Sequence, residues 1–195
     1  FGGKLGIDAT KKSDDQVIID KDYKTCQCDY DSFQTEIKKN IPEIKKINTS
    51  LCKKGINIIF AGIEKNKSKI VKSAHNKITS MECAENIKAI FYTDIEADFD
   101  EINMLIWRCA NNYDPKRDTF FPEKDISSAI GLDCTRKTKK YDDFNRPWPN
   151  IVTMDETTIN TIDDKWKSLG LKQFYNSPSK KYLSQSYKGK AQAEE

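Results

Sequence analysis

The sequence predicts an α/β fold in which a mostly parallel or mixed sheet is flanked by helices. Three observations support this prediction. Several short apolar runs are rich in β-branched residues, which is typical of buried strands. Other segments place apolar residues at intervals of three and four, which is typical of helices. The two kinds of segment alternate along the 195 residues, which favours strand–helix–strand connections.

The strands are predicted from short apolar segments. Gly55–Ile63 and Lys88–Asp94 are almost continuous apolar runs, and their length favours buried strands over helices. The weaker candidates are residues 1–12, which would enter a basic loop, the segment around Val17–Ile19, and the short runs Thr119–Phe121 and Ala129–Asp133.

The helices are predicted from apolar spacing and from residues that favour helix ends. We expect helices over Phe33–Ile47, with a kink or break at Pro42, and over Lys67–Thr79. A third helix is expected over Asp98–Asn111, because Asp98 followed by Glu101 is close to a capping box. The last helix is expected over Asp155–Leu169, with Gly170 as its C-cap and an inward stripe of Ile159, Ile162, Trp166 and Leu169.

Composition excludes several classes of protein. The 33 Lys and Arg residues are balanced by 30 Asp and Glu residues, so we expect no nucleic-acid partner. No segment approaches the ~18 apolar residues of a membrane span, and no signal peptide is visible. We therefore predict a cytoplasmic protein with free thiols, in which Cys109 and Cys134 are small core residues. The six cysteines are Cys26, Cys28, Cys52, Cys83, Cys109 and Cys134.

No catalytic, cofactor-binding or metal-binding residue is predicted in this chain. The acidic run from Asp94 to Glu101 lacks the Gly and Glu of an EF-hand loop and is interpreted as a strand end followed by a helix start. Cys26 and Cys28 lack the spacing and partners of a zinc site. His75 lies in a Lys-rich predicted helix, so we expect a solvated surface histidine.

A seven-residue pattern occurs twice, as GIDATKK from Gly6 to Lys12 and as GLDCTRK from Gly131 to Lys137. Each copy is followed by a polar segment and then by a predicted helix. The chain begins at Phe1 within such a motif, so we expect it to be a piece of a longer protein. The repeat indicates that two related units contribute to the chain, and that the shared Asp and Thr close backbone groups at strand ends.

Several short motifs follow one another in a definite order along the chain. They are Thr93-Asp94-Ile95-Glu96, Glu101 with Trp107, Asp114-Pro115-Lys116-Arg117-Asp118, the heptad Gly131–Lys137, Arg146-Pro147, and Ile162–Leu169. This ordered set resembles the C-terminal domain of the UbiD family of decarboxylases over about residues 51–171. The chain departs from the family pattern in having Arg108 where Ala is usual, Asn112 for Arg, Ala129 for Lys and Cys134 for Ala.

The resemblance implies three segments. Residues 1–50 would be the strand, loop and helix that end a preceding unit of the same type. Residues 51–171 would be a second, degenerate C-terminal domain, and residues 172–195 a polar C-terminal extension.

The resemblance also implies a function for the longer protein. The family uses prenylated FMN and a divalent metal such as manganese to decarboxylate aromatic and unsaturated acids, for example a hydroxybenzoate of quinone biosynthesis. Its catalytic and cofactor motifs are absent from this chain, so we expect a non-catalytic structural domain that is inactive alone. The expected partners are the remaining domains of the enzyme and further copies of it, with Phe144 and Trp148 as candidate interface residues. For Trp148, a core residue at a corner of the family fold is an equally good interpretation.

A different hypothesis is a non-enzymatic α/β interaction module that shares only the fold. A basic segment would then meet an acidic partner or a membrane surface as a peripheral contact, although a solvated loop is the simpler interpretation of it. The basic residues are Arg136, Lys137, Lys139 and Lys140.

Overall fold

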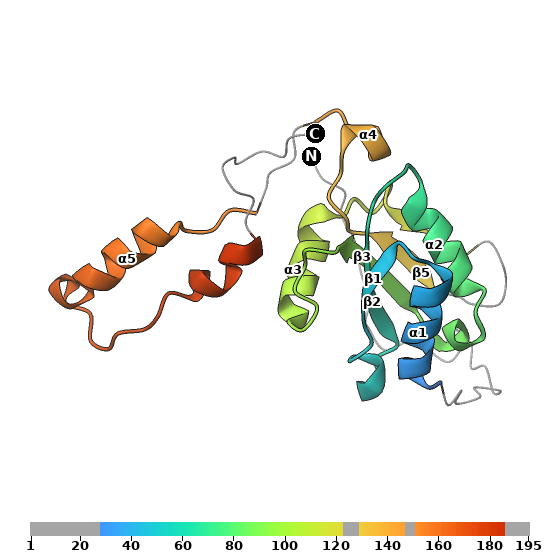
Figure 1. The fold of residues 1–195 in the computed structure, drawn as a ribbon, viewed down its shortest axis with the longest axis horizontal. Helices are drawn as coiled ribbons and strands as arrows, with labels where there is room; N and C mark the ends of the chain where they lie inside the picture. Colours follow the sequence, from blue (N-terminus) through green and yellow to red (C-terminus); the bar gives the residue numbers. More distant parts are fainter. Residues whose placement is uncertain (1–27, 123–128, 147–150, 186–195) are drawn as a thin grey trace, which may run out of the picture. The chain divides into compact units, whose positions relative to one another are not determined.

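The computed structural model describes residues 28–122, 129–146 and 151–185, which divide into two compact units after Arg136 (Figure 1). The first unit contains a five-stranded mixed sheet with the order β1-β2-β3-β5-β4, which confirms the predicted fold class. Strands β2, β3 and β5 are parallel, and β1 and β4 pair antiparallel at the two edges. The strands are β1 (Ile44–Asn48), β2 (Ile58–Ile63), β3 (Ala89–Asp94), β4 (Thr119–Phe120) and β5 (Ile130–Asp133).

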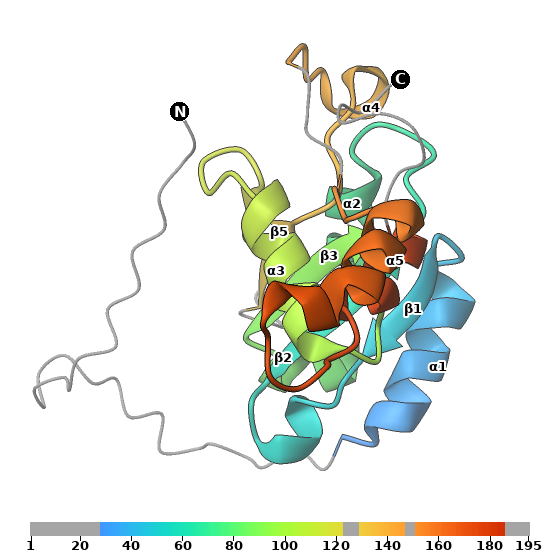
Figure 2. The same cartoon turned by 90° about the vertical axis from the view of Figure 1, so that its left-hand side faces the viewer.

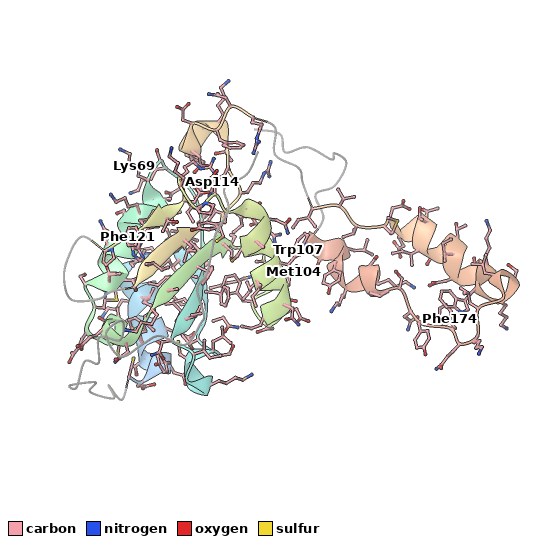
Figure 3. All side chains as sticks on the ribbon, turned by 180° about the vertical axis from the view of Figure 1, so that it is seen from behind. Lys69, Met104, Trp107, Asp114, Phe121 and Phe174 are labelled. Carbon is pink, nitrogen blue, oxygen red and sulfur yellow. The ribbon has the colours of Figure 1, made fainter. Side chains whose placement is uncertain are left out.

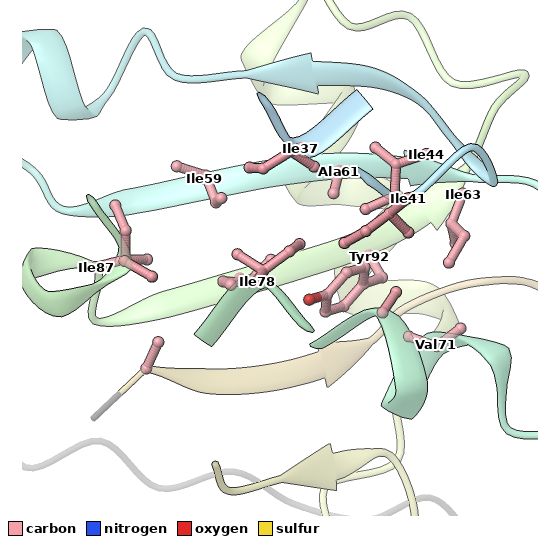
Figure 4. Packing of buried hydrophobic residues seen from close by; sticks show 14 of the residues in the cluster. Ile37, Ile41, Ile44, Ile59, Ala61, Ile63, Val71, Ile78, Ile87 and Tyr92 are labelled. Carbon is pink, nitrogen blue, oxygen red and sulfur yellow. The ribbon is translucent and has the colours of Figure 1, made fainter. Parts of the chain in front are cut away.

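Helices cover both faces of this sheet (Figures 1 and 2). α1 (Tyr30–Asn40) and α2 (Ile70–Thr79) lie on one face, and α3 (Ile102–Asn112) lies on the other. Successive strand residues point to opposite faces, so each strand feeds two cores. Figure 4 shows the larger core, where α1 and α2 pack on β1, β2 and β3 around residues that include Ile37, Ile59, Ile78, Ile87 and Tyr92.

The smaller core lies under α3, where Leu105 and Cys109 pack with Phe60 and Leu132 of the sheet. Burial of Cys109 and Cys134, which are 5% and 1% exposed, confirms that both are core residues. Met104 and Trp107 project from the side of α3 that faces away from the sheet (Figure 3).

The predicted helices have different bounds in the structure, and for two of them the physical cause is clear. α1 ends at Asn40, and Ile44 begins β1 instead of a fourth helical turn, because Pro42 cannot continue a helix. α3 begins at Ile102, since the Asp98 carboxylate accepts the N–H of Asp100 at 3.0 Å and so stabilises a turn that competes with a helical start.

The division that we expected between residues 50 and 51 does not coincide with a break in the fold. β1 pairs with β2 from Ile44 opposite Ile63 to Asn48 opposite Phe60, and α1 shares one core with β2 and β3. The expected strands in residues 1–12 and around Val17–Ile19, and with them the first heptad, lie outside the described residues. The duplication therefore stays a prediction.

The described residues of the second unit form α4 (Lys139–Asp142), α5 (Glu156–Lys165) and two 3-10 helices, Trp166–Leu169 and Pro178–Gln185. Asp155 caps α5 by accepting the N–H of Thr158 at 2.8 Å, and Gly170 ends this segment with a φ of 70°. The predicted inward stripe is only partly correct, because Ile159 is 3% exposed whereas Ile162 and Leu169 are 45% and 52% exposed. In the described parts of the chain, no helix is both long and apolar enough to cross a bilayer.

Candidate functional site

The carboxyl ends of the parallel strands bring several charged residues to one edge of the sheet. Lys65 follows β2, Asp94 ends β3 and Asp133 ends β5. In open α/β sheets this edge is where ligands usually bind, so it is the first place to examine for a site. We call the residues gathered here the strand-end cluster: Lys65, Asp94, Arg108, Asp118, Asp133, Thr135 and Arg136.

Asp94 links β3 to the loop that follows β5. Its two carboxylate oxygens accept the backbone N–H of Arg136 at 3.2 and 3.0 Å. The guanidinium of Arg108, on α3, lies 3.5 Å from one of these oxygens. Burial raises the pKa of Asp94, and the Arg136 N–H and the Arg108 cation oppose that rise because both favour the charged form.

Arg108 is one of the positions where the chain departs from the family pattern, and the structure gives it a partner. Its side chain is 8% exposed, and Asp94, whose side chain is 19% exposed, supplies the opposite charge. A guanidinium this deeply buried would be costly without a carboxylate nearby, so the two residues depend on each other.

Asp133 closes the loop that follows β5. Its carboxylate accepts the N–H of Thr135 at 3.0 Å and also the hydroxyl of Thr135, and both residues are buried. This confirms the structural role predicted for the Asp and Thr of the second heptad. Because Asp133 is only 9% exposed, its carboxylate does not face solvent.

Asp118 organises the Asp-Pro-Lys-Arg-Asp turn between α3 and β4. The guanidinium of Arg117 donates to both carboxylate oxygens at 2.7 Å, and the N–H of Asp114 donates at 2.9 Å. The backbone carbonyl of Asp118 then accepts the N–H of Asp133 at 2.8 Å, which ties the turn to β5. Asp118 is thus the ion-pair partner of Arg117 within this turn.

The prediction that His75 is a solvated histidine is wrong. Its side chain is fully buried, its Nδ1 lies 3.1 Å from the hydroxyl oxygen of Tyr92, and its ring packs against Phe120. Burial lowers the pKa of His75 to about 4, against a smaller opposing effect of the Ala129 backbone. The Lys-rich pattern around His75 misled the prediction, because those lysines occupy the other side of α2.

Gly131 of the second heptad is explained by this buried group. A Cβ at Gly131 would lie 2.5 Å from Cδ2 of Phe120 and 2.8 Å from Nδ1 of His75. The motif therefore requires glycine for close packing of β5 against these two rings.

The basic segment after β5 is not uniformly solvated. Lys137 is 3% exposed and the Arg136 backbone is bonded on both sides, whereas Lys139 and Lys140 are exposed. Of the two candidate interface aromatics, Phe144 is half-buried with the Arg146 guanidinium 5.4 Å from its ring centre, and Trp148 lies outside the described residues.

The polar side chains of the strand-end cluster form a structural hydrogen-bond network. Each carboxylate of the strand-end cluster accepts hydrogen bonds from backbone groups or from a neighbouring side chain. Within residues 28–122, 129–146 and 151–185, no three His, Cys, Asp or Glu side chains are grouped so that they could hold a metal ion.

Comparison with known proteins gives a family match and several distant relatives. Residues 31–136 match the family model of the 3-octaprenyl-4-hydroxybenzoate carboxy-lyase C-terminal domain. An uncharacterized protein of Aeropyrum pernix is 26% identical over 98 residues, which are 43% of this chain and 20% of that protein.

Among solved structures, the closed form of the vanillic acid decarboxylase of Sedimentibacter hydroxybenzoicus has a TM-score of 0.50 at 14% identity, covering 70% of this chain and 31% of that one. An evolved dimeric form of the UbiD-class enzyme HmfF of Pelotomaculum thermopropionicum, in complex with prFMN, has a TM-score of 0.49 at 19% identity, covering 65% and 27%. The likeness to the first of these shows a shared fold. The chain spans less than a third of each of these three proteins.

Proposed function

The chain belongs to the UbiD family, whose C-terminal domain matches its residues 31–136, and on this basis we propose that it is the non-catalytic C-terminal part of a UbiD-like decarboxylase. The proposed substrate of the whole enzyme is an aromatic acid such as a hydroxybenzoate of quinone biosynthesis. The family match supports this reading because it covers the complete sheet of the first unit, from α1 to the loop after β5.

One observation carries the non-catalytic role. The carboxylates at the strand ends, where an α/β protein would place its chemistry, are bonded to the loops that they hold. A general acid or base must instead reach a substrate atom, directly or through one water. The Asp94 carboxylate accepts the Arg136 N–H, and the Asp118 carboxylate accepts from the Arg117 guanidinium and the Asp114 N–H.

The cofactor is proposed to bind to other parts of the enzyme. Prenylated FMN, the cofactor of the family, supplies the electron sink for decarboxylation when it is bound. The described residues do not fit the divalent metal that accompanies it, such as manganese, because they offer no group of ligands for it. The role of this chain in the enzyme would be to supply a rigid, helix-covered sheet against which the cofactor-binding part and further copies can pack.

The test is a decarboxylation assay on the purified 195-residue chain. With prenylated FMN, Mn²⁺ and a panel of hydroxybenzoates and cinnamates, we expect CO₂ release no higher than in a reaction without protein. In a polypeptide that also carries the flavin-binding region of the family, we expect turnover that is lost when this chain is deleted.

Turnover by the isolated chain would contradict the non-catalytic role. If deletion of the chain leaves the activity of the larger polypeptide unchanged, the decarboxylase assignment fails and the interaction module becomes the better hypothesis. Asp118→Ala in the larger polypeptide is the control for loss of stability. It weakens the turn before β4 and leaves Asp94 unchanged, so its activity shows how much destabilisation alone lowers turnover.

A further inference from the structure

Residues at the ends of two neighbouring strands hold the backbone of a single residue, Arg136, far along the chain. The N–H of Arg136 donates to both oxygens of Asp94, 42 residues earlier, at 3.2 and 3.0 Å. The carbonyl oxygen of Arg136 accepts the Lys65 ammonium, 71 residues earlier, at 3.1 Å. Both bonds involve a charged partner, and such hydrogen bonds are stronger than those between neutral groups.

Arg136 lies at the boundary between the two compact units. Arg136 is the last residue of the first compact unit, and Lys137 is the first residue of the second. Asp94 ends β3 and Lys65 follows β2, so the bonds attach the end of the first unit to the rigid centre of its sheet.

The residues around Arg136 strengthen the attachment. Arg108 lies 3.5 Å from Asp94, which favours the charged carboxylate and limits its movement. On the other side, Asp133 holds the N–H of Thr135, and the N–H of Cys134 donates to the carbonyl oxygen of Tyr92 at 2.9 Å. Backbone groups of three consecutive residues, 134 to 136, are therefore bonded to groups of β3 or β5.

We propose that Asp94 and Lys65 form an anchor for the backbone of Arg136, and that Arg108 is a positioning residue that orients Asp94. The anchor holds residues 134–136 against the ends of β2 and β3 and so fixes the conformation of the loop after β5. In this role the strand-end cluster controls local opening of that loop, a function separate from decarboxylation and independent of it.

The test uses ¹⁵N-labelled full-length chain and compares wild type with Asp94→Ala, Asp94→Asn and Glu96→Gln. In Asp94→Ala we expect the Arg136 amide to exchange with solvent at least tenfold faster, and the ¹H–¹⁵N heteronuclear NOE of residues 135 and 136 to fall. Asp94→Asn should show a smaller effect, because its amide oxygen still accepts a hydrogen bond. Glu96→Gln is the matched control, since Glu96 is exposed and lies in the same loop.

The exchange rates of the β2 and β3 amides distinguish a local anchor at Arg136 from a general effect of Asp94 on the stability of the sheet. The proposal expects their exchange to stay within about twofold of wild type in Asp94→Ala. An unchanged Arg136 amide would overturn it, and so would a parallel rise in the exchange of β2, β3 and β5 amides. If Asp94→Ala does not fold, Lys65→Met carries the same expectation for residues 135 and 136, and a rigid Arg136 in that variant would overturn the proposal.

Discussion

His75 and Tyr92 form a buried polar pair between α2 and β3, and the protonation of each is set by burial. Burial, reinforced by the charge of Asp133, raises the pKa of Tyr92, so its hydroxyl keeps its proton, and its oxygen lies 3.1 Å from Nδ1 of His75. Burial also lowers the pKa of His75 to about 4, so the ring stays neutral at neutral pH. Protonation of His75 would place a charge in the core between α2 and β3.

At this residue scale, the pair predicts acid sensitivity. The unfolded chain gains a proton on His75 near its ordinary pKa of 6.5, whereas the folded chain gains it only near 4. Stability that is fully present above about pH 6.5 should therefore be lost as the pH falls toward 4, by about 3 kcal/mol at most. His75→Gln should remove this part of the pH dependence.

Urea unfolding of both proteins between pH 4 and 7.5 measures the effect. Other titrating groups are shared by the two proteins, so the difference between their pH slopes isolates His75. Equal slopes would show that this histidine is accessible to protons in the folded state.

At the scale of elements, the Asp-Pro-Lys-Arg-Asp turn decides where α3 ends and β4 begins. Asp114 accepts the N–H groups of Lys116 and Arg117, and Asp118 holds the Arg117 guanidinium. Asp118 is 4% exposed, whereas the side chain of its partner Arg117 is 35% exposed, so the buried carboxylate is paired with a guanidinium that reaches solvent. The turn thereby positions β4 against β5, where Phe120 pairs with Gly131.

Asp118→Ala should destabilise the chain by about 2 kcal/mol, because the Asp114 N–H and the Arg117 guanidinium lose a charged acceptor. Lys116→Ala in the same turn should change stability by less than about 0.5 kcal/mol, since the Lys116 side chain is exposed. Chemical denaturation of the two variants gives both values. Equal destabilisation by the two changes would mean that the turn conformation, and not the Asp118 carboxylate, carries the stability.

At the scale of the whole molecule, two compact units share one chain, and each has its own contacts. The first unit contains the family sheet and both of its cores. In the second, Trp166 donates from its indole to the carbonyl oxygen of Gln173 at 2.9 Å and meets Phe174 edge-on, while Lys180 pairs with Asp163 at 2.9 Å. These contacts close α5 and the 3-10 helix Pro178–Gln185 into a small helical hairpin.

We expect this chain to self-associate, as the proposed role in a larger enzyme assembly requires. Large apolar side chains are exposed in both units, among them Ile106 and Trp107 on α3, at 51% and 46% exposed. Burial of such side chains between copies would be favourable. Sedimentation velocity over a range of concentrations should show a rising sedimentation coefficient, whereas a monomer at the highest concentration would contradict the expectation.

The sequence by itself determined the fold class, most of the strands and the family. The run Lys88–Asp94 predicts a central strand, because a short segment that is apolar on both sides is stable when both of its faces are buried in a sheet. The motifs Asp114–Asp118 and Gly131–Lys137 were recognisable because their polar residues act on neighbours in the chain.

Only the tertiary structure decided which distant residues meet. Local spacing contains no information on what covers a residue from another part of the chain, so His75 could not be distinguished from an exposed histidine. For the same reason the sequence could not reveal that Arg108 pairs with Asp94, or that Asp94 and Lys65 converge on Arg136. The order β1-β2-β3-β5-β4 brings these groups to one edge, and strand order is set by the packing of the whole sheet.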